Sequence, residues 1–135
     1  TTGTGLRDTF RQGARRFDVG GHSNDVTLSM ANASLDQVLD WGPAPVADYC
    51  ARLMEPLVTY LRSSPYAVPG PDDHLGHILG IRHNDFTTTE RAMTEISKRN
   101  IGVSLRGDAI RVSPNVYNTP ADIDVLVEAL HAARP

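Results

Sequence analysis

The sequence predicts an α+β fold, in which a small, mostly antiparallel sheet of about three strands carries helices packed on one face. The first observation is the order of the apolar patterns, which change between helical and strand spacing along the chain. The second is a hairpin-like turn, Arg106-Gly107-Asp108, between two short strand-forming runs. The third is composition: 135 residues with 40% hydrophobic and 21% charged side chains are typical of one globular domain.

The N-terminal third is predicted to form an arm and a helix. Residues 1–22 hold five glycines and no sustained periodicity, so we expect an extended arm, with residues 23–135 forming a single domain. A helix over 24–41 follows, because its apolar residues fall roughly on one face and Gly42 can end it. The apolar residues of this face are Val26, Met30, Ala33, Val38 and Trp41.

A second helix is predicted to begin at Pro43, a residue that suits the first turn of a helix. Pro56 lies inside its apolar stripe and is expected to kink or divide the helix. Trp41 and Tyr49 are expected to pack in the core between these two helices. The stripe consists of Val46, Tyr49, Cys50, Leu53, Leu57, Tyr60 and Leu61.

The C-terminal half follows a Pro/Gly-rich loop over 63–73. A strand is predicted over 77–82, and the sequence TTTE at 87–90 predicts a capping box that opens a helix ending near Asn100. Two strands, 101–105 and 109–113, should pair as a hairpin. The residues Thr119-Pro120-Ala121-Asp122 are expected to cap a last helix.

Charge and cysteine content exclude several classes of protein. The net charge is −3 and the basic residues are scattered, apart from Arg11, Arg15 and Arg16, so we expect no nucleic-acid partner. The apolar runs are too short to cross a bilayer and the first residues lack a signal-peptide core, so we expect no membrane association and a cytoplasmic location. The single cysteine, Cys50, excludes an internal disulfide and is expected to be a buried, small apolar side chain.

Arg111 is the most informative single residue of the chain. It occupies a polar position of the alternating run Ile110-Arg111-Val112-Ser113 and precedes a loop rich in Asn and Tyr. Spacing alone permits two interpretations: a surface arginine on a half-buried strand, or a ligand-binding arginine.

Four segments resemble, in the same order, the C-terminal small domain of class V aminotransferases, which are fold-type I pyridoxal-phosphate enzymes. The segments are RRFDVGGHSN (15–24), LDQVLDWG (35–42), GHILGIR (76–82) and NIGVSLRGDAIRVSPNVYNTPADIDVLVEAL (100–130). The resemblance therefore runs from about residue 15 to the end of the chain. The stretch RVSPNVYNT is its most specific part.

This resemblance implies roles for a few residues. The arginine of the family's R-x-S-x-x-x-Y-N-T signature binds the α-carboxylate of the amino-acid substrate, and here that residue is Arg111. A planar guanidinium suits this role because it holds a carboxylate through two parallel, charge-assisted hydrogen bonds. Asn115 is expected at the rim of the site and in shaping its loop, and His22 and Asn24 are also expected near the rim.

The chain also departs from the family in two respects. Cysteine desulfurases carry a reactive cysteine in the loop that here reads Arg106-Gly107-Asp108-Ala109, so sulfur transfer is disfavoured. Pyridoxal phosphate needs a lysine for covalent attachment, and the only lysine, Lys98, is predicted to be a solvated surface residue. We therefore expect no cofactor in this chain alone, and pyridoxal phosphate only in the parent family.

Two functional hypotheses follow. The chain is either the substrate-binding small domain of a class V aminotransferase or epimerase-like enzyme, or a free-standing homologue that works without the cofactor. The second class includes a carboxylate-binding, protein-interaction or cofactor-free catalytic module. The first predicts an apolar surface covered by the large domain of the same enzyme or by self-association into a dimer. His74, His77 and His83 match no metal-binding spacing, so we predict no metal site.

Overall fold

The computed structural model describes residues 12–17, 25–68, 70 and 76–134. The chain forms two compact units, Thr1–Val38 and Leu39–Pro135. Most of the predicted arm, together with His22 and Asn24, lies outside the described residues. Within the arm, Gly13–Phe17 forms the 3-10 helix η1.

A three-stranded antiparallel sheet organises the second unit. Its strands are β1 (Leu79–Ile81), β2 (Ser104–Arg106) and β3 (Ala109–Val112), and β3 lies in the centre, in the order β1-β3-β2. Strands β2 and β3 form the predicted hairpin, and Gly107 has a positive φ of 61° in its turn. That angle is available to glycine at little cost.

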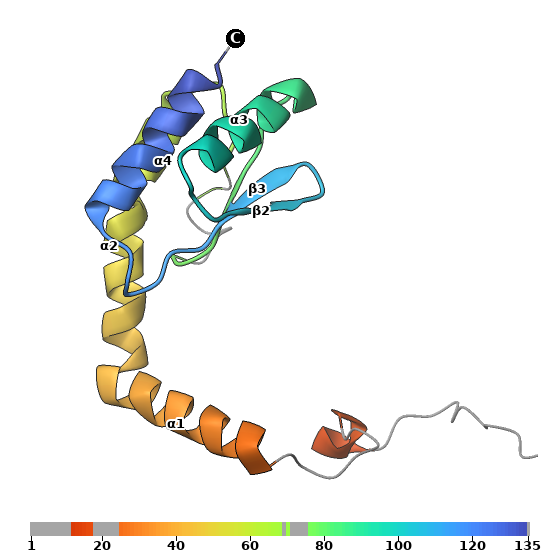
Figure 1. Cartoon of the computed structure of the whole chain (residues 1–135), viewed down its shortest axis with the longest axis vertical. Helices are drawn as coiled ribbons and strands as arrows, with labels where there is room; N and C mark the ends of the chain where they lie inside the picture. The colour runs from red at the N-terminus through yellow and green to blue at the C-terminus, as the bar shows by residue number, and fades with distance from the viewer. Residues whose placement is uncertain (1–11, 18–24, 69, 71–75, 135) are drawn as a thin grey trace, which may run out of the picture. The chain divides into compact units, whose positions relative to one another are not determined.

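Three helices cover one face of this sheet, which confirms the predicted α+β fold (Figure 1). They are α2 (Pro43–Arg62), α3 (Phe86–Lys98) and α4 (Pro120–Ala132). Helix α4 packs against both α2 and α3, and α3 contacts β3. The core between helices and sheet includes the fully buried Leu57, Leu61, Ile81, Ile96, Ile110 and Leu130.

Helix α1 (Asp25–Trp41) has no buried side chain. Residues three, four or seven positions apart share one side of a helix. Val26, Met30 and Ala33 therefore lie on one side of α1, and a second apolar stripe, Leu28, Leu35 and Leu39, lies on another. All the large side chains of both stripes are exposed, from 49% for Leu28 to 68% for Val26. The apolar face predicted for this helix is thus present and accompanied by a second one.

Several local predictions are confirmed. Helix α1 ends at Trp41, Gly42 takes a positive φ of 80°, and α2 begins at Pro43. Helix α4 is capped by residues 119–122 as predicted, and the cap is a capping box in which Thr119 and Asp122 exchange side-chain to backbone hydrogen bonds. Cys50 is buried, as expected.

Other local predictions are wrong. Helix α3 begins at Phe86, because the Asp85 carboxylate caps it: Oδ1 accepts from the Thr87 N–H at 3.1 Å. The threonines of TTTE therefore lie inside the first turn. Helix α2 runs undivided through Pro56. Trp41 is 47% exposed instead of buried, because α2 turns its apolar stripe toward α4 and the sheet. None of the helices in the described part of the chain combines the length and hydrophobicity needed to cross a bilayer.

Candidate functional site

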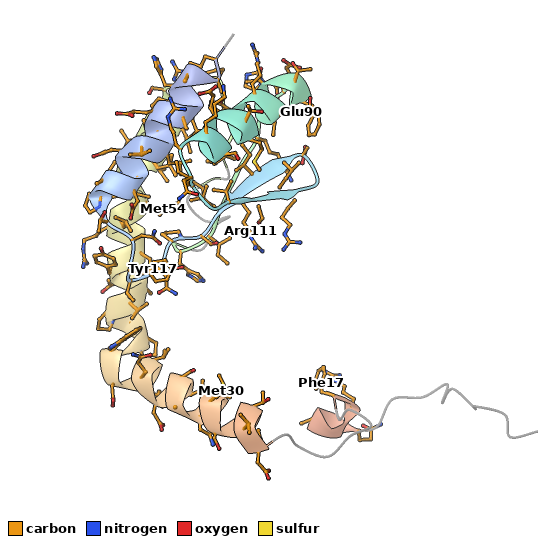
Figure 2. The ribbon with its side chains drawn as sticks, in the orientation of Figure 1. Phe17, Met30, Met54, Glu90, Arg111 and Tyr117 are labelled. Atoms are coloured by element: carbon orange, nitrogen blue, oxygen red, sulfur yellow. The ribbon has the colours of Figure 1, made fainter. Side chains whose placement is uncertain are left out.

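The face of the sheet that carries Arg111 is the opposite of the one that forms the core. Successive side chains of a strand point to opposite faces, and Ile110 and Val112 are buried in the core. Arg111 and Ala109 therefore belong to the other face, on which Figure 2 shows Arg111 directed away from α3. We call this the outer face.

The strand register places two small residues beside Arg111. Gly80 of β1 and Ser104 of β2 are its direct partners across the sheet. The three residues form one row on the outer face, with Arg111 in the middle. Because Gly80 has no side chain and Ser104 has a short one, neither covers the guanidinium from its side.

Arg111 is half-buried, and its Nε is buried without a hydrogen-bond partner among the described residues. The Oγ of Ser104 is also buried without a hydrogen-bond partner among the described residues. A buried polar group without a partner costs about 1–3 kcal/mol. Two such groups on directly paired residues give the row hydrogen-bonding capacity that the surrounding protein does not use.

A hollow of about 290 Å³ adjoins this row. It is lined by Ala67, Val68, Gly80, Arg82 and Ala109. A Cβ placed on Gly80 would lie 3.9 Å from the Cβ of Ala109, which is an ordinary contact. The position of Gly80 therefore has space for a side chain. Because glycine has none, the hollow stays open next to the row that contains Arg111.

The outer face also carries an ion pair at the hairpin end. The Nε of Arg82 lies 3.0 Å from Oδ1 of Asp108, and both side chains are largely exposed. This pair is at the surface, so it adds little to stability. Its arginine, Arg82, also lines the hollow.

The loop after β3 is tied to α2 and α4. The Tyr49 hydroxyl donates to the Asn118 carbonyl at 2.6 Å, and the Cys50 thiol donates to the Pro114 carbonyl at 3.7 Å. The backbone N–H of Asn115 donates to the Asn118 side-chain carbonyl at 3.0 Å. The loop that continues from Arg111 is thus held by several contacts, which limits the movement of the end of β3.

Asp122 connects the same loop to α4. Its Oδ2 accepts the Thr119 N–H at 2.8 Å and approaches the Asn118 amide at 3.5 Å. The hydrogen bond from the backbone N–H of Thr119, and after it the one from the side-chain amide of Asn118, lowers the pKa of the Asp122 carboxyl below its usual range. The ionised carboxylate is therefore the form that holds this helix start.

The other residues singled out in the sequence do not join the row. Asn115 shapes the loop after β3, and its Oδ1 accepts the Val116 N–H at 2.7 Å. Tyr117 is 77% exposed. Lys98 lies on the surface, where its Nζ is 2.7 Å from Oε1 of Glu95, as predicted for a solvated lysine. Among the described residues, no group of three His, Cys, Asp or Glu side chains is placed to share a metal ion.

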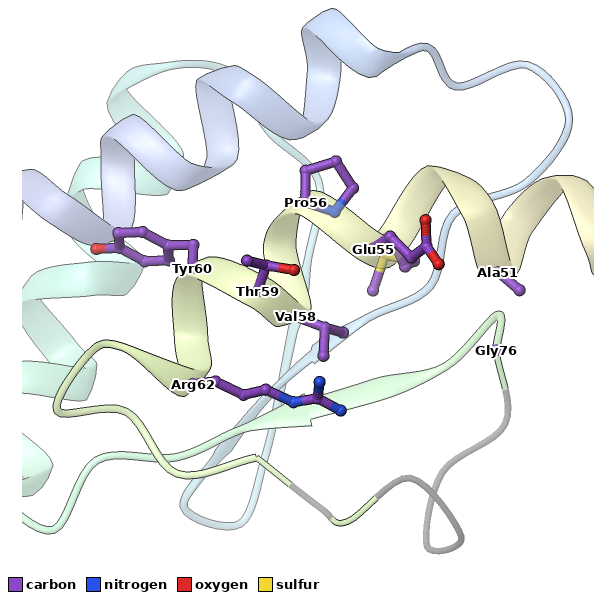
Figure 3. Close-up of a pocket in the computed structure, with 9 residues that line it drawn as sticks. Ala51, Glu55, Pro56, Val58, Thr59, Tyr60, Arg62 and Gly76 are labelled. Carbon is purple, nitrogen blue, oxygen red and sulfur yellow. The ribbon is translucent and has the colours of Figure 1, made fainter.

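A wider hollow, of about 930 Å³, runs along α2 (Figure 3). Among the described residues that line it, the charged ones are Glu55 and Arg62, which are seven residues apart and thus about 10 Å apart along the helix axis. At that separation they form no acid–base pair. The opposite wall includes Gly76, whose backbone approaches α2 so closely that a Cβ there would lie 2.9 Å from the Cβ of Ala51.

Sequence reasoning placed Arg111 on the polar side of its strand but missed Gly80 and Ser104 as its neighbours. The alternation in HILGIR predicts that Gly80 lies on the polar side of β1. The pattern in IGVSL does not decide on which face Ser104 lies. The register that brings them together depends on pairing between distant segments, which no local pattern contains.

No protein-family model matches the chain, and no curated protein sequence does. Solved structures do match. A NifS-like protein aligns with a TM-score of 0.71 at 18% identity, over 92% of this chain and 37% of that one. A NifS-like protein from Rickettsia africae ESF-5 aligns with a TM-score of 0.66 at 20% identity, over 95% and 39%. A transaminase with L-alanine gives 0.62 at 19% identity, over 80% and 27%.

These comparisons confirm the predicted resemblance as a likeness of fold. The chain spans 37–39% of the length of the two NifS-like proteins and 27% of that of the transaminase.

Proposed function

We propose that the chain is the substrate-binding small domain of a class V pyridoxal-phosphate-dependent enzyme of the aminotransferase or epimerase kind, and that Arg111 binds the carboxylate of the substrate. The observation that carries the proposal is the burial of Arg111 and its unused hydrogen-bond donor. It is half-buried in the central strand, and its Nε has no partner among the described residues although it is buried. The shared fold and the RVSPNVYNT signature support the same role.

The position of Arg111 suits the binding of a carboxylate. A guanidinium offers parallel N–H donors that match the two carboxylate oxygens, and each charge-assisted hydrogen bond contributes about 1.5–3 kcal/mol. Half-burial reduces screening by water and salt, so the attraction is stronger than at an open surface. The central strand of a sheet is also a rigid support, which keeps the donor group in one place.

The described residues do not fit a covalently bound pyridoxal phosphate. The chain has a single lysine, Lys98, which is exposed and paired with Glu95 at 2.7 Å. The cofactor would be held by the large domain of the same enzyme. The role of this chain is then to bind and orient the substrate.

The two exposed apolar stripes of α1 are evidence for a large protein partner that covers this helix. A helix that is apolar on more than one side is normally buried on more than one side. In α1 the large apolar side chains of both stripes are exposed. A large domain of the same enzyme, or a second copy of the chain in a dimer, would cover them.

The absence of a thiol in the turn between β2 and β3 restricts the class of reaction. The turn Arg106-Gly107-Asp108 and the following Ala109 contain no thiol, and Cys50 is buried in α2. Buried thiols in apolar surroundings are poor nucleophiles. We therefore favour amino-group or proton transfer over sulfur transfer.

A free-standing carboxylate-binding module is the second candidate. It is favoured by the core of the second unit, which is formed by α2, α3, α4 and the sheet without any buried residue of α1. A monomer that stays monodisperse at high concentration in light scattering would support this candidate against the enzyme domain.

Titration with glutaramate, a mono-anionic carboxylate, tests the role of Arg111. We expect binding to the full chain to shift the amide resonances of β3, and Arg111→Gln to weaken the affinity by about tenfold or more. Arg52→Gln, which removes an exposed arginine of α2, is the matched control and should bind like the parent. Equal affinities for the parent and Arg111→Gln would contradict the proposal.

A further inference from the structure

Next to the row of Gly80, Arg111 and Ser104, the outer face has a second row of residues, which contains two more arginines. Arg106 of β2 is the direct partner of Ala109, which is two residues from Arg111 and on the same face. Arg82 lies two residues beyond Gly80, the partner of Arg111 on β1. The two arginines therefore flank Ala109 on either side, each diagonal to Arg111. Diagonal neighbours in a sheet lie about 7–8 Å apart.

Small side chains separate these three guanidinium groups. Gly80, Ser104 and Ala109 occupy the remaining positions of the two rows. The surface between the arginines therefore carries no large side chain, and the 290 Å³ hollow lined by Gly80, Arg82 and Ala109 lies at its β1 side. A ligand can lie flat across the strands and reach more than one guanidinium.

The positive charge of this face is only partly balanced. Asp108 pairs with Arg82 at 3.0 Å. Neither Arg106 nor Arg111 makes an ion pair with a described residue, and the three strands themselves contain no acidic residue. Like charges at neighbouring positions of a sheet are destabilising. An anion bound between them removes this repulsion.

We propose that the outer face binds a ligand with two anionic groups, a short dicarboxylate, with Arg111 holding one carboxylate and Arg106 the other. This inference rests on the proposed function, since it requires the carboxylate site at Arg111. It adds the substrate class and names Arg106 as the residue that determines it. The second carboxylate meets the guanidinium of Arg106, which is exposed and makes no ion pair with a described residue.

The test compares glutarate with glutaramate on the full chain by calorimetric titration. The two probes have the same shape, and one of them lacks the second negative charge. We expect glutarate to bind the parent about tenfold more tightly, as one additional charge-assisted contact provides. Arg106→Gln should reduce this preference to less than about twofold, because it should weaken the binding of glutarate more than that of glutaramate. Arg106→Lys keeps the charge and should retain part of the preference.

The variants separate the two proposals. Arg111→Gln should weaken both ligands, whereas Arg52→Gln should weaken neither. A parent that binds both ligands equally, or a preference that Arg106→Gln leaves intact, would overturn the dicarboxylate inference alone. Glutaramate affinity that is absent, or insensitive to Arg111→Gln, would overturn the proposed function and this inference with it. Unchanged circular dichroism of each variant ensures that a lost affinity is not a loss of fold.

Discussion

Ser104→Ala is expected to stabilise the protein and to weaken carboxylate binding at the same time. The Oγ of Ser104 is buried and has no hydrogen-bond partner among the described residues. An unsatisfied buried hydroxyl costs about 1–3 kcal/mol, and alanine removes the hydroxyl while keeping the Cβ. We therefore expect the free energy of unfolding to rise by about 1 kcal/mol, the lower end of that range. For a chain of 135 residues, this corresponds to an unfolding midpoint about 3–5 °C higher.

Urea unfolding and thermal melting, both followed by circular dichroism, measure this change. Ser113→Ala is the matched control, because Ser113 directly follows β3 and is exposed, so its replacement should change the stability by less than about 0.5 kcal/mol. A Ser104→Ala variant that is less stable than the parent would show that the hydroxyl is satisfied, and would refute the argument that the row beside Arg111 has unused hydrogen-bonding capacity. Glutaramate titration of the same variant measures the expected loss of affinity.

Three further predictions concern the surroundings of the row. The Asp122 pKa is lowered by the Thr119 backbone N–H, so its stabilising contribution is present above the ordinary carboxyl pKa of about 4 and is lost as the pH falls through the lower, folded value; Asp122→Asn should flatten this part of the acid-unfolding curve, and an unchanged curve would contradict it. Tyr49→Phe removes the 2.6 Å bond to the loop after β3 and should lower the free energy of unfolding by about 0.5–1.5 kcal/mol in urea titrations, whereas no loss would mean that water replaces the hydroxyl. Asp108→Asn frees Arg82 and should raise the affinity for glutarate by about two- to threefold, whereas weaker binding would mean that the ion pair orders the hairpin for the ligand.

The helices were predictable from the sequence because their signals are local. The 3.6-residue spacing of apolar side chains and residues such as Gly42 and Pro43 fixed α1 and α2 to within about a residue. The start of α3 was not predictable, because Asp85 and Thr87 are both good capping residues and their local sequence does not distinguish them. The exposure of Trp41 was also missed, since periodicity shows which side is apolar but not what covers it.

The candidate site was predictable only in part. Alternation in β3 is a local pattern, and it placed Arg111 on the polar face of its strand. Its neighbours depend on how β1 and β2 pair with β3, and β1 is about thirty residues away in the chain. Strand register of this kind is decided by tertiary packing, so Gly80 and Ser104 emerged only from the structure. The roles predicted for His22 and Asn24 lie outside the described residues and stay predictions.

The affinity of Arg111→Gln for glutaramate is the most direct test of the central claim that this half-buried guanidinium binds a carboxylate. A loss of about tenfold or more relative to the parent and to Arg52→Gln, with β3 resonances that no longer shift, is the result we predict. Binding as tight as that of the parent would show that Arg111 is an ordinary strand residue with no ligand of its own.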